Sequence, residues 1–481
     1  MPGPLSRRHF MASAAAAGAA VTFPSSARSS MAVDEIGIGF ISCGGRAGGH
    51  MGVFGKMSDV NVTALCDPDE GRLGSAQKRF NKAKGYTDLR KLLEDSSVDA
   101  VVVATTNHWH CLASIWAMEA GKDVYVEKPL SHSQWEGEQT VLAARKYNRI
   151  CQVGTQQRSD PMQAEIKKFL HEDKALGQIL HARVNRYGVR GAIGKRDTPL
   201  KISDSVNYDL WLGPAQDKPI FRNKLQYDWH WDFNTGSGEM GNWGVHVLDD
   251  LRNNVFQDSV RLPQRIFGGG GRVAWNDAGD TPNVHFVGFD TGSIPVVIGL
   301  TNLTAGKGGK GSPRHPGPGS GYIAYCEGGR LEGQRGRAAA FDKDGKKIKD
   351  FRGNSGGGHQ RNFIDAVRSR NISSLNADVE VGHLSTGWCN LANIAFQAGR
   401  PFRMEDSNQL PNQHGIWQDL VKSMQEHLDS HDVAITSDQV KLSPVLTIDP
   451  ETDRFTGAGA DAANAFIKRQ YRAPYVVPEI G

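Results

Sequence analysis

Residues 39–49 read GFISCGGRAGG, an apolar strand that runs into a glycine-rich turn. The dinucleotide-binding fingerprint G-x-G-x-x-G aligns here with Ser42, Gly44 and Ala47. The first position needs only a tight bend, and the third packs a helix against a strand, where alanine fits. The middle position must let backbone N–H groups approach a pyrophosphate, and it has kept its glycine. The stretch therefore predicts a phosphate-binding turn.

A carboxylate follows at the spacing that this fingerprint requires. Asp67 ends the next apolar run, residues 60–67, about 20 residues beyond the turn. There a carboxylate binds both ribose hydroxyls and repels a 2′-phosphate, so Asp67 favours NAD over NADP. Arg46 in the turn weakens this preference and leaves NADP as the alternative. The pair Asp67-Pro68 is also a typical helix N-cap, a role that is compatible with ribose binding.

Strands and helices alternate over the first third of the chain. Segments with helical spacing separate apolar runs at 36–42, 60–67, 98–105 and 123–127. This alternation predicts an α/β fold with a parallel sheet and right-handed crossovers. We therefore assign residues 34–155 to a Rossmann domain.

The pattern changes after residue 155. Apolar and polar residues alternate, as in half-exposed antiparallel strands, at 179–189, 266–275, 284–302 and 323–331. These runs predict a second, α+β domain over residues 156–405, followed by a C-terminal extension over 406–481. Residues 304–321, rich in glycine and proline, predict a flexible loop, with an active-site flap as the alternative.

The N-terminus has the pattern of an export signal. SRRHFM, at residues 6–11, precedes a short alanine-rich run and the polar SSARSS. A twin arginine before such a run predicts a twin-arginine signal over residues 1–33, and the run is too short for a membrane span. Because that route carries folded proteins, we expect a periplasmic or extracellular protein that is loaded with its cofactor before export. A disordered tail is the alternative.

Charge and cysteine content argue against other classes. The net charge is +4 in 481 residues, with no basic stripe of the kind that nucleic acid requires. None of the six cysteines forms a C-x-x-C pair, so they predict core residues rather than a disulfide frame or a zinc site. His108 and His110 would supply only two ligands, so we expect no metal.

Polar loops follow two of the predicted strands. Ligands of open α/β sheets bind beyond the carboxyl ends of strands, so TTNHWH (105–110) and YVEKPLS (125–131) are placed to meet the cofactor. With the turn, they give the expected cofactor contacts: Ser42, Gly44, Gly45, Arg46, Ala47, Asp67, Thr105, Asn107, His110, Glu127 and Lys128.

A later segment carries a second polar cluster. Residues 236–250 read GSGEMGNWGVHVLDD. Helical spacing puts Asn242, His246 and either Asp249 or Asp250 on one face of a helix.

These three segments together resemble the Gfo/Idh/MocA family of sugar and cyclitol oxidoreductases. The resemblance covers residues 36–400 and includes WLGP at 211–214. The closing YRAPYVVPEI and the export signal resemble the secreted branch of the family. Membership implies a Rossmann domain plus a second, substrate-binding domain with an open-faced, mostly antiparallel sheet. It also implies association through that sheet, as a homodimer or homotetramer.

The resemblance implies roles for individual residues. Lys128 of E-K-P matches the family lysine beside the nicotinamide, where its ammonium orients the substrate hydroxyl and stabilises charge on oxygen. Glu127 supports this lysine, and a cis bond is expected before Pro129. His246 matches the family histidine that accepts the proton.

The chain departs from the family at two positions. Asn242 stands where many members have aspartate, and an amide can only hydrogen-bond. Either another carboxylate, such as Asp249, serves instead, or the chemistry is altered. Thr106 replaces a frequent proline, which we expect to be harmless.

Other residues are candidates for the sugar pocket. Aromatic rings stack on the C–H faces of sugars, and a pocket role is predicted for Arg158, Tyr187, residues 229–231 with Trp231, and Asp249. Packing in the core is the alternative for the aromatic residues.

The leading prediction is an NAD(P)-dependent oxidoreductase that moves hydride between its cofactor and a sugar, cyclitol or glycoside hydroxyl. Because free NAD is scarce outside the cytoplasm, we expect a tightly held cofactor that is recycled within the site. One alternative is a glycoside lyase or hydrolase that acts through a transient 3-keto sugar. The other is a non-catalytic sugar-binding protein, which the Asn242 change supports.

Overall fold

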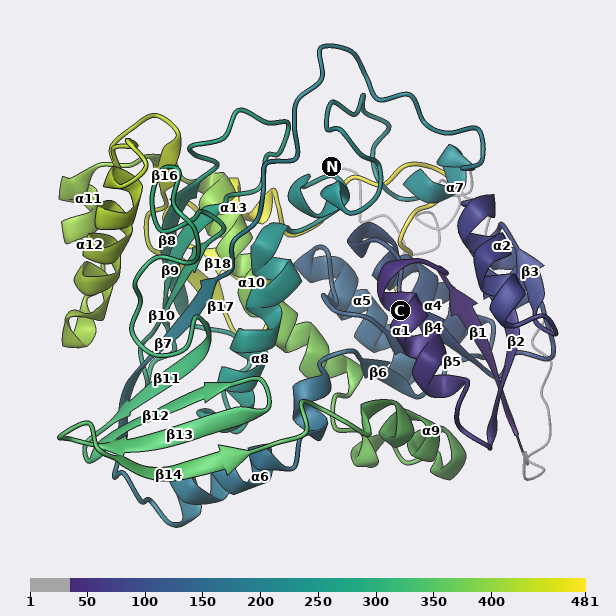
Figure 1. Ribbon diagram of the computed structural model, residues 1–481, viewed down its shortest axis with the longest axis horizontal. Helices are drawn as coiled ribbons and strands as arrows, with labels where there is room; N and C mark the ends of the chain where they lie inside the picture. The colour runs from purple at the N-terminus through teal and green to yellow at the C-terminus, as the bar shows by residue number, and fades with distance from the viewer. Residues whose placement is uncertain (1–34) are drawn as a thin grey trace, which may run out of the picture.

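Six parallel strands form the N-terminal sheet of the computed structural model, which describes residues 35–481 (Figure 1). Their order is β3-β2-β1-β4-β5-β6. The strands are β1 (Ile36–Ile41), β2 (Val60–Cys66), β3 (Lys84–Tyr86), β4 (Ala100–Val103), β5 (Asp123–Val126) and β6 (Cys151–Val153). The order reverses where β1 lies between β2 and β4, which is where ligands bind in such sheets. The predicted Rossmann architecture is confirmed.

Helices connect these strands as the alternation predicted. They are α1 (Gly45–Phe54), α2 (Glu70–Arg79), α3 (Leu89–Leu93), α4 (His110–Glu119) and α5 (Gln134–Lys146). The N-cap of α2 is Asp69, whose side chain accepts from the N–H groups of Gly71 and Arg72. The capping alternative for Asp67 is therefore wrong, because the helix begins two residues later than the Asp-Pro pair indicated.

The second domain is built on a twelve-stranded sheet. Its path is β14-β13-β12-β11-β7-β10-β9-β8-β16-β15. Off this path, β17 pairs with β8, and β18 pairs with β17. All pairs are antiparallel except β7 with β10. The strands are β7 (Ile179–Tyr187), β8 (Arg265–Gly271), β9 (Val284–Asp290), β10 (Val296–Thr301), β11 (Ser320–Cys326), β12 (Gly329–Gln334), β13 (Arg337–Asp342), β14 (Lys347–Arg352), β15 (Arg400–Pro401), β16 (Val440–Leu442), β17 (Leu446–Asp449) and β18 (Arg454–Thr456).

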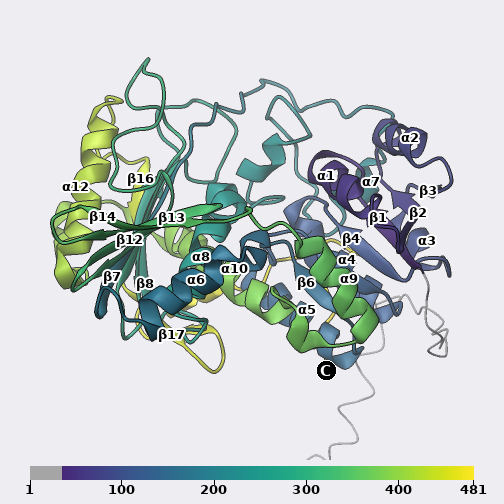
Figure 2. The ribbon, with the colours of Figure 1, turned by 60° about the horizontal axis from the view of Figure 1, so that its bottom comes forward.

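Helices lie on both faces of this sheet (Figure 2). The longer helices on this sheet are α8 (Val245–Asn254), α10 (Val379–Ala398) and α12 (Ile416–Asp429), whereas α9 (His359–Ser369) packs against α1 of the Rossmann domain. Short helices are α6 (Met162–Lys167), α7 (Tyr208–Leu212), α11 (Met404–Asn408) and α13 (Ala460–Asn464). Single 3₁₀ or π turns are η1 (Asn107–Trp109), η2 (Gln156–Ser159), η3 (Lys168–Glu172), η4 (Asp228–Trp231), η5 (Met240–Gly244), η6 (Ile372–Ser374) and η7 (Gln413–Gly415).

The sheet face that the resemblance implied to be open is partly covered. Helices α8 and α10 pack on the face toward the Rossmann domain, and α12 packs on the opposite face (Figure 2). Trp417 and Leu420 of α12 are fully buried in a cluster with Phe286 of β9 and Val297 of β10. The stretch 406–481 thus supplies α12 and β16–β18 to this domain and closes its outer face over β9 and β10.

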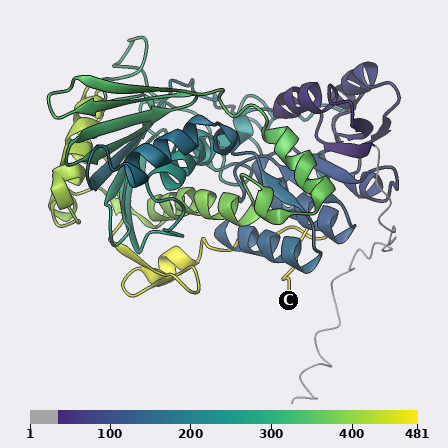
Figure 3. The same ribbon diagram turned by 90° about the horizontal axis from the view of Figure 1, so that it is seen from below.

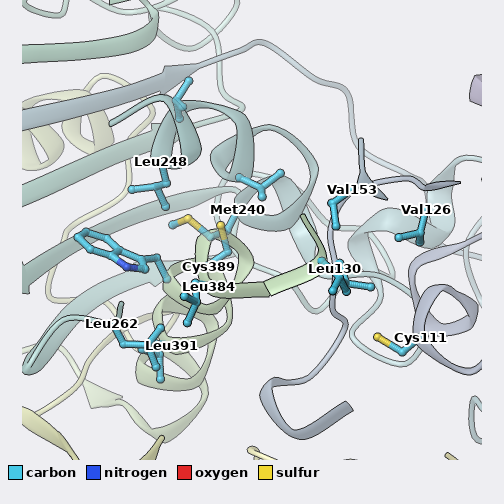
Figure 4. Close-up of a cluster of buried hydrophobic side chains, with 14 of the residues drawn as sticks. Cys111, Val126, Leu130, Val153, Met240, Leu248, Leu262, Leu384, Cys389 and Leu391 are labelled. Carbon is cyan, nitrogen blue, oxygen red and sulfur yellow. The ribbon is translucent and has the colours of Figure 1, made fainter. Parts of the chain in front are cut away.

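One apolar core joins the two domains (Figure 4). It runs from Val126 and Val153 of the Rossmann sheet through Leu130 and Met240 to Leu248 of α8. Helix α9 adds a second connection, because its Phe363 lies in a cluster with β1 and α1. We therefore expect the cleft between the domains to be held rigidly.

The last part of the chain returns to the Rossmann domain (Figure 3). The Ile480 N–H donates to Oε1 of Gln139 on α5 at 2.7 Å. The ring of Tyr475 lies 5.5 Å from that of Trp109 and 6.4 Å from that of Trp116. Residues predicted to be an extension therefore contribute to both domains.

The glycine-rich loop is anchored to the outer face of the second sheet. His315 stacks on Tyr187 with ring centroids 4.9 Å apart, and Asn185 donates to the Pro316 carbonyl oxygen at 2.6 Å. No residue of 304–321 lines the cavity at the Rossmann strand ends, so the flap alternative finds no support in this arrangement. Within residues 35–481, no helix is both long and apolar enough to cross a bilayer. The predicted export signal, residues 1–33, lies outside the described residues.

Candidate active site

A cavity of about 340 Å³ opens at the carboxyl ends of β1, β2 and β4. Its size is within the usual range for small-molecule sites. The structure brings nearly all of the predicted cofactor contacts to its wall: Ser42, Gly44, Gly45, Arg46, Asp67, Thr105, Asn107, His110, Glu127 and Lys128, together with Asn242. Ala47 is fully buried instead, as expected for the position that packs α1 against the sheet.

The turn at the start of α1 has the backbone geometry of a phosphate cradle. Ser42 takes the place of a glycine and has a φ of 87°, which a side chain makes unfavourable. Helix α1 follows with no acidic side chain in its first turn. A Cβ at Gly44 would lie 2.1 Å from Nη1 of Arg72, so this guanidinium lies directly against the glycine of the turn. These residues fit a dinucleotide, whose pyrophosphate the N–H groups of α1 and Arg72 would hold.

Asp67 is fixed at the end of β2. Its Oδ2 accepts from the Cys43 N–H at 2.8 Å and from the Ser42 hydroxyl at 3.4 Å, and its Oδ1 accepts from the Asp69 N–H at 2.9 Å. Burial raises the pKa of Asp67, against the opposing effect of the N–H groups of Cys43 and Asp69. The carboxylate is thus oriented by the backbone and keeps lone pairs for a ribose.

Glu127 lies at the centre of a charged network under the cavity. Its Oε1 accepts from Arg46 at 3.0 Å, His50 at 2.8 Å and Gln156 at 3.0 Å. Burial acts to raise the pKa of Glu127, but His50, Arg46 and Lys128 together hold it well below its usual value. Glu127 is therefore an anion that supports Lys128 electrostatically and holds Arg46 beside the turn.

Lys128 reaches from the cis Lys128–Pro129 peptide to the second domain. Its Nζ donates to the backbone carbonyl oxygen of Asn242 at 2.7 Å and lies 3.4 Å from Oδ1 of that residue. Burial lowers the pKa of Lys128, and the charges of Glu127 and Glu239 oppose this effect. The expected cis bond before Pro129 is confirmed.

Glu239 is a buried, charged neighbour of Asn242 that the sequence argument missed. It is fully buried, and its Oε2 accepts from the Asn242 amide at 3.0 Å. Arg186 and Arg190 donate to its Oε1 at 2.8 and 3.1 Å. The carboxylate associated with Asn242 is thus Glu239 and not Asp249, and its position three residues before Asn242 was the available signal.

Two neutral imidazoles lie near Lys128. Burial, and then the Lys128 charge, lower the pKa of His246 well below its usual value. His246 makes a ring contact with Trp243 and is outside the residues that line the cavity. His230 does line the cavity, and burial lowers its pKa to about 3. Its Nδ1 lies 2.6 Å from the Tyr227 carbonyl oxygen, which leaves Nε2 as an acceptor.

The predicted helix face is split by a π-helical turn. Asn242 lies in η5, whereas His246, Asp249 and Asp250 lie in the α-helix that follows. Asp249 accepts from Arg158 at 2.7 Å and from Ser385 at 2.6 Å, away from Lys128. The altered spacing explains why the helical pattern did not bring these side chains together.

Four predicted substrate contacts lie elsewhere, and this assignment is corrected. Arg158 is paired with both Asp249 and Asp258 at 2.7 Å. Tyr187 is buried in the core under α12, and Trp231 is buried outside the cavity lining. Tyr187, Trp231 and Asp249 are at most 5% exposed, so they have almost no surface to offer a sugar. Their neighbours Trp229 and His230 do line the cavity.

Aromatic rings form the remaining wall of the cavity. They come from segments far apart in the chain: Trp109, Trp116, Trp211, Tyr227, Trp229 and Tyr475. Trp229 stacks on His230 with ring centroids 3.6 Å apart. A charged network at the strand ends, with aromatic rings opposite, is the arrangement of a ligand site in a Rossmann-type α/β protein.

Comparison with known families agrees with this class. The family described as "Oxidoreductase family, NAD-binding Rossmann fold" matches residues 36–155, and its "C-terminal alpha/beta domain" matches residues 165–266. The chain therefore belongs to the Gfo/Idh/MocA oxidoreductases. A twin-arginine translocation signal matches residues 4–24.

Individual relatives match over part of the chain. Inositol 2-dehydrogenase 2 of Saccharopolyspora erythraea is 34% identical over 145 residues, which are 30% of this chain and 42% of that protein. Glycosyl hydrolase family 109 protein 2 of Shewanella sp. is 33% identical over 130 residues, 25% of this chain and 28% of that protein. The chain thus spans less than half the length of these curated relatives.

A solved structure shows the same fold over a longer stretch. The WlbA dehydrogenase from Bordetella pertussis, crystallised with NADH and UDP-GlcNAcA, has a TM-score of 0.55. The identity is 17%, and the match covers 74% of this chain and 94% of that one.

Proposed function

We propose that this protein is a nicotinamide-dependent oxidoreductase that acts on a CH–OH group of a sugar, cyclitol or glycoside. The observation that carries the proposal is the Lys128 ammonium, held at 2.7 Å on the Asn242 carbonyl in the wall of the cavity that also contains the glycine turn. A cation so placed stabilises negative charge on a substrate oxygen. The family assignment and the inositol dehydrogenase relative support this substrate class.

The residues divide the work as follows. The coenzyme, when bound, exchanges hydride with the carbinol carbon. Lys128 donates to the carbinol oxygen and stabilises the charge that develops there. We assign the hydroxyl proton to His246, which is neutral because burial and the Lys128 charge lower its pKa, although it lies outside the cavity lining. The alternative acceptor is His230, which lines the cavity and has Nε2 available. Asn242 and Glu239 position the lysine, and Trp229 offers an aromatic face to the sugar ring.

The coenzyme of this proposal is NAD, tightly held. Asp67 at the end of β2 disfavours a 2′-phosphate, while Arg72 is available to the pyrophosphate. The twin-arginine match supports export to the periplasm, where a coenzyme lost at each turnover would not be replaced. We propose a homodimer or homotetramer, although α12 restricts association through the sheet face over β9 and β10.

A second candidate is the cleavage of a glycoside through a transient 3-keto sugar. The relative named as a glycosyl hydrolase family 109 protein favours it. Lys128 and His246 keep the same roles in this candidate. The coenzyme would end each turnover in the oxidation state in which it began. A sugar-binding protein without activity is the third candidate, and the Glu239–Asn242 contact weakens its main support.

Native mass spectrometry of the mature exported protein tests the proposal. We expect bound dinucleotide and a mass of two or four subunits. Lys128→Ala should retain the dinucleotide and lose hydride transfer to a panel of sugars and inositols by about 10²- to 10³-fold, whereas the exposed Lys91→Ala should change nothing. A protein that arrives without dinucleotide and binds none tightly contradicts internal recycling. Full activity of Lys128→Ala contradicts the proposed chemistry.

A further inference from the structure

A second polar cavity, of about 470 Å³, lies apart from the candidate active site. Amide side chains dominate its wall, among them Gln134, Asn234, Asn390 and Asn393, and we call it the amide cavity. Among the described residues, it shares no lining residue with the coenzyme cavity. Its volume falls within the range of small-molecule sites.

The amide cavity adjoins the loop at residues 105–110, which lines the coenzyme cavity. Ser237 lines it and donates its hydroxyl to Oδ1 of Asn107, a coenzyme-cavity residue, at 2.9 Å. Asn393 of α10 donates to the Ser237 carbonyl oxygen at 2.9 Å. The C-terminal residues that follow α13, including Phe466 and Arg469, form the remaining side. The Ser237–Asn107 hydrogen bond therefore links the walls of the two cavities.

Buried polar atoms of this wall have no partner within the described protein. They are Oε1 of Gln134, Oδ1 of Asn393 and Nδ1 of His132. These residues are only 2%, 5% and 9% exposed, respectively. Buried polar groups of native proteins are almost always hydrogen-bonded, so this wall is suited to a ligand that brings its own polar groups. Hydroxyl groups, which both donate and accept, match amide side chains.

Arg469 gives the cavity an unpaired positive charge. One nitrogen donates to the Asn234 carbonyl oxygen at 2.7 Å, and another lies 2.9 Å from Nε2 of His132. In the part of the chain that the structure describes, no carboxylate lies within ion-pair distance of it. Burial lowers its pKa to about 10, as expected for a cation without a counter-ion.

The nearby carboxylates are already engaged. Asp232 pairs with Arg222 at 2.6 Å. Asp280 accepts from the Phe233 N–H at 2.7 Å, and burial raises its pKa to about 6. The guanidinium of Arg469 has five N–H donors, of which two are used, so it can still bind a carboxylate in the two-pronged geometry that arginine favours.

We propose that the amide cavity binds a sugar unit that carries a carboxylate, with Arg469 on the carboxylate and the Gln134, Asn390 and Asn393 amides on the hydroxyls. Phe233 and Phe466 line the same space and offer apolar faces to the ring. This site is independent of the redox function, because it has its own wall and its own charge. It would give the protein a second, acidic-carbohydrate ligand.

Isothermal titration of the full mature protein with three probes tests the site. Galacturonate carries both the carboxylate and the hydroxyls, galactose only the hydroxyls, and acetate only the carboxylate. We expect galacturonate to bind with a Kd of about 1 mM or lower, and each partial probe at least about tenfold more weakly. Equal affinity for galactose and galacturonate overturns the proposal, as does the absence of galacturonate binding.

Variants assign the binding to this cavity. Arg469→Gln should weaken galacturonate binding by about tenfold or more and leave galactose unaffected, whereas the exposed Arg403→Gln should bind like the wild type. Lys128→Ala should also bind galacturonate normally, which separates this site from the active site. If Arg469→Gln fails to fold, Arg469→Lys keeps the charge without the fork and should show intermediate affinity. Wild-type affinity in the folded Arg469 variants overturns the assignment.

Discussion

The Lys128 ammonium is held by the backbone of Asn242 more closely than by its side chain: Nζ lies 2.7 Å from the carbonyl oxygen and 3.4 Å from Oδ1. Every residue type carries this carbonyl. The position of the lysine therefore does not depend on an aspartate at 242, and the departure from the family pattern changes the charge near the lysine rather than its geometry.

Asn242→Asp should shift the alkaline limb of the kcat/KM profile to higher pH. Burial lowers the pKa of Lys128, and a new carboxylate within about 4 Å favours the charged ammonium by about one pKa unit or more. The measurement is kcat/KM from pH 6 to 11 for the variant and for the exposed Asn223→Asp as control. An unmoved alkaline limb would show that Lys128 does not set it.

Variants of the two imidazoles near Lys128 should differ in whether they change kcat or KM. We expect His246→Gln to lower kcat by about 10²- to 10⁴-fold at nearly constant KM, because it removes the proton acceptor. His230→Gln should mainly raise KM, because His230 lines the cavity. In the wild type, the acidic limb should fall below pH 6.5, since burial lowers the pKa of both groups. The reverse pattern would move the acceptor role to His230.

Arg72 should contribute to dinucleotide affinity. Its guanidinium lies over Gly44 and is partnered only loosely, by Asp69 at 3.5 Å. Arg72→Gln should raise the Kd for NADH by about tenfold through the loss of one charge-assisted contact to phosphate. Fluorescence titration measures this change, with the exposed Lys78→Gln on the same helix as control. Equal Kd values for both variants would exclude Arg72 from the site.

Glu136→Gln should stabilise the protein more at pH 8 than at pH 5. Burial raises the pKa of Glu136 to about 8 from its ordinary 4.5, so the folded state binds more protons than the unfolded state between these values. Glu136 therefore lowers the free energy of unfolding as pH rises through that window. Glutamine does not ionise, so the variant avoids this decrease. The expected gain at pH 8 relative to pH 5 exceeds about 1 kcal/mol.

Denaturant unfolding at the two pH values measures this difference. The exposed Glu165→Gln on α6 is the matched control and should show the same stability change at both. A gain for Glu136→Gln that does not depend on pH would mean that Glu136 is ionised in the folded protein.

The sequence predicted those features that depend on local pattern. The alternation of apolar runs located the Rossmann strands, and spacing from the turn located Asp67 at the end of β2. Strands β15–β18 escaped prediction because they have only two to four residues, and β15, β16 and β17 pair with strands distant in the chain. Such strands have no periodicity of their own to detect.

Site residues were misassigned where a partner distant in the sequence determines what the side chain contacts. Arg158 was expected at the sugar, but Asp249 and Asp258 lie 91 and 100 residues away in sequence and neutralise it. Glu239 was missed because the contacts that mark it come from Arg186 of β7 and from Arg190 in the loop that follows β7. A buried network of this kind is visible only once the second sheet is in place.

The placement of Tyr475 has a consequence for biosynthesis. Its ring completes the wall of a cavity whose glycine turn is made more than 400 residues earlier. The ribosome must therefore pass position 475 before this wall is complete, so a coenzyme that needs the whole pocket joins a nearly finished fold. If the coenzyme is loaded before export, as the twin-arginine match leads us to expect, loading falls in the interval between release of the chain and its passage through the translocon.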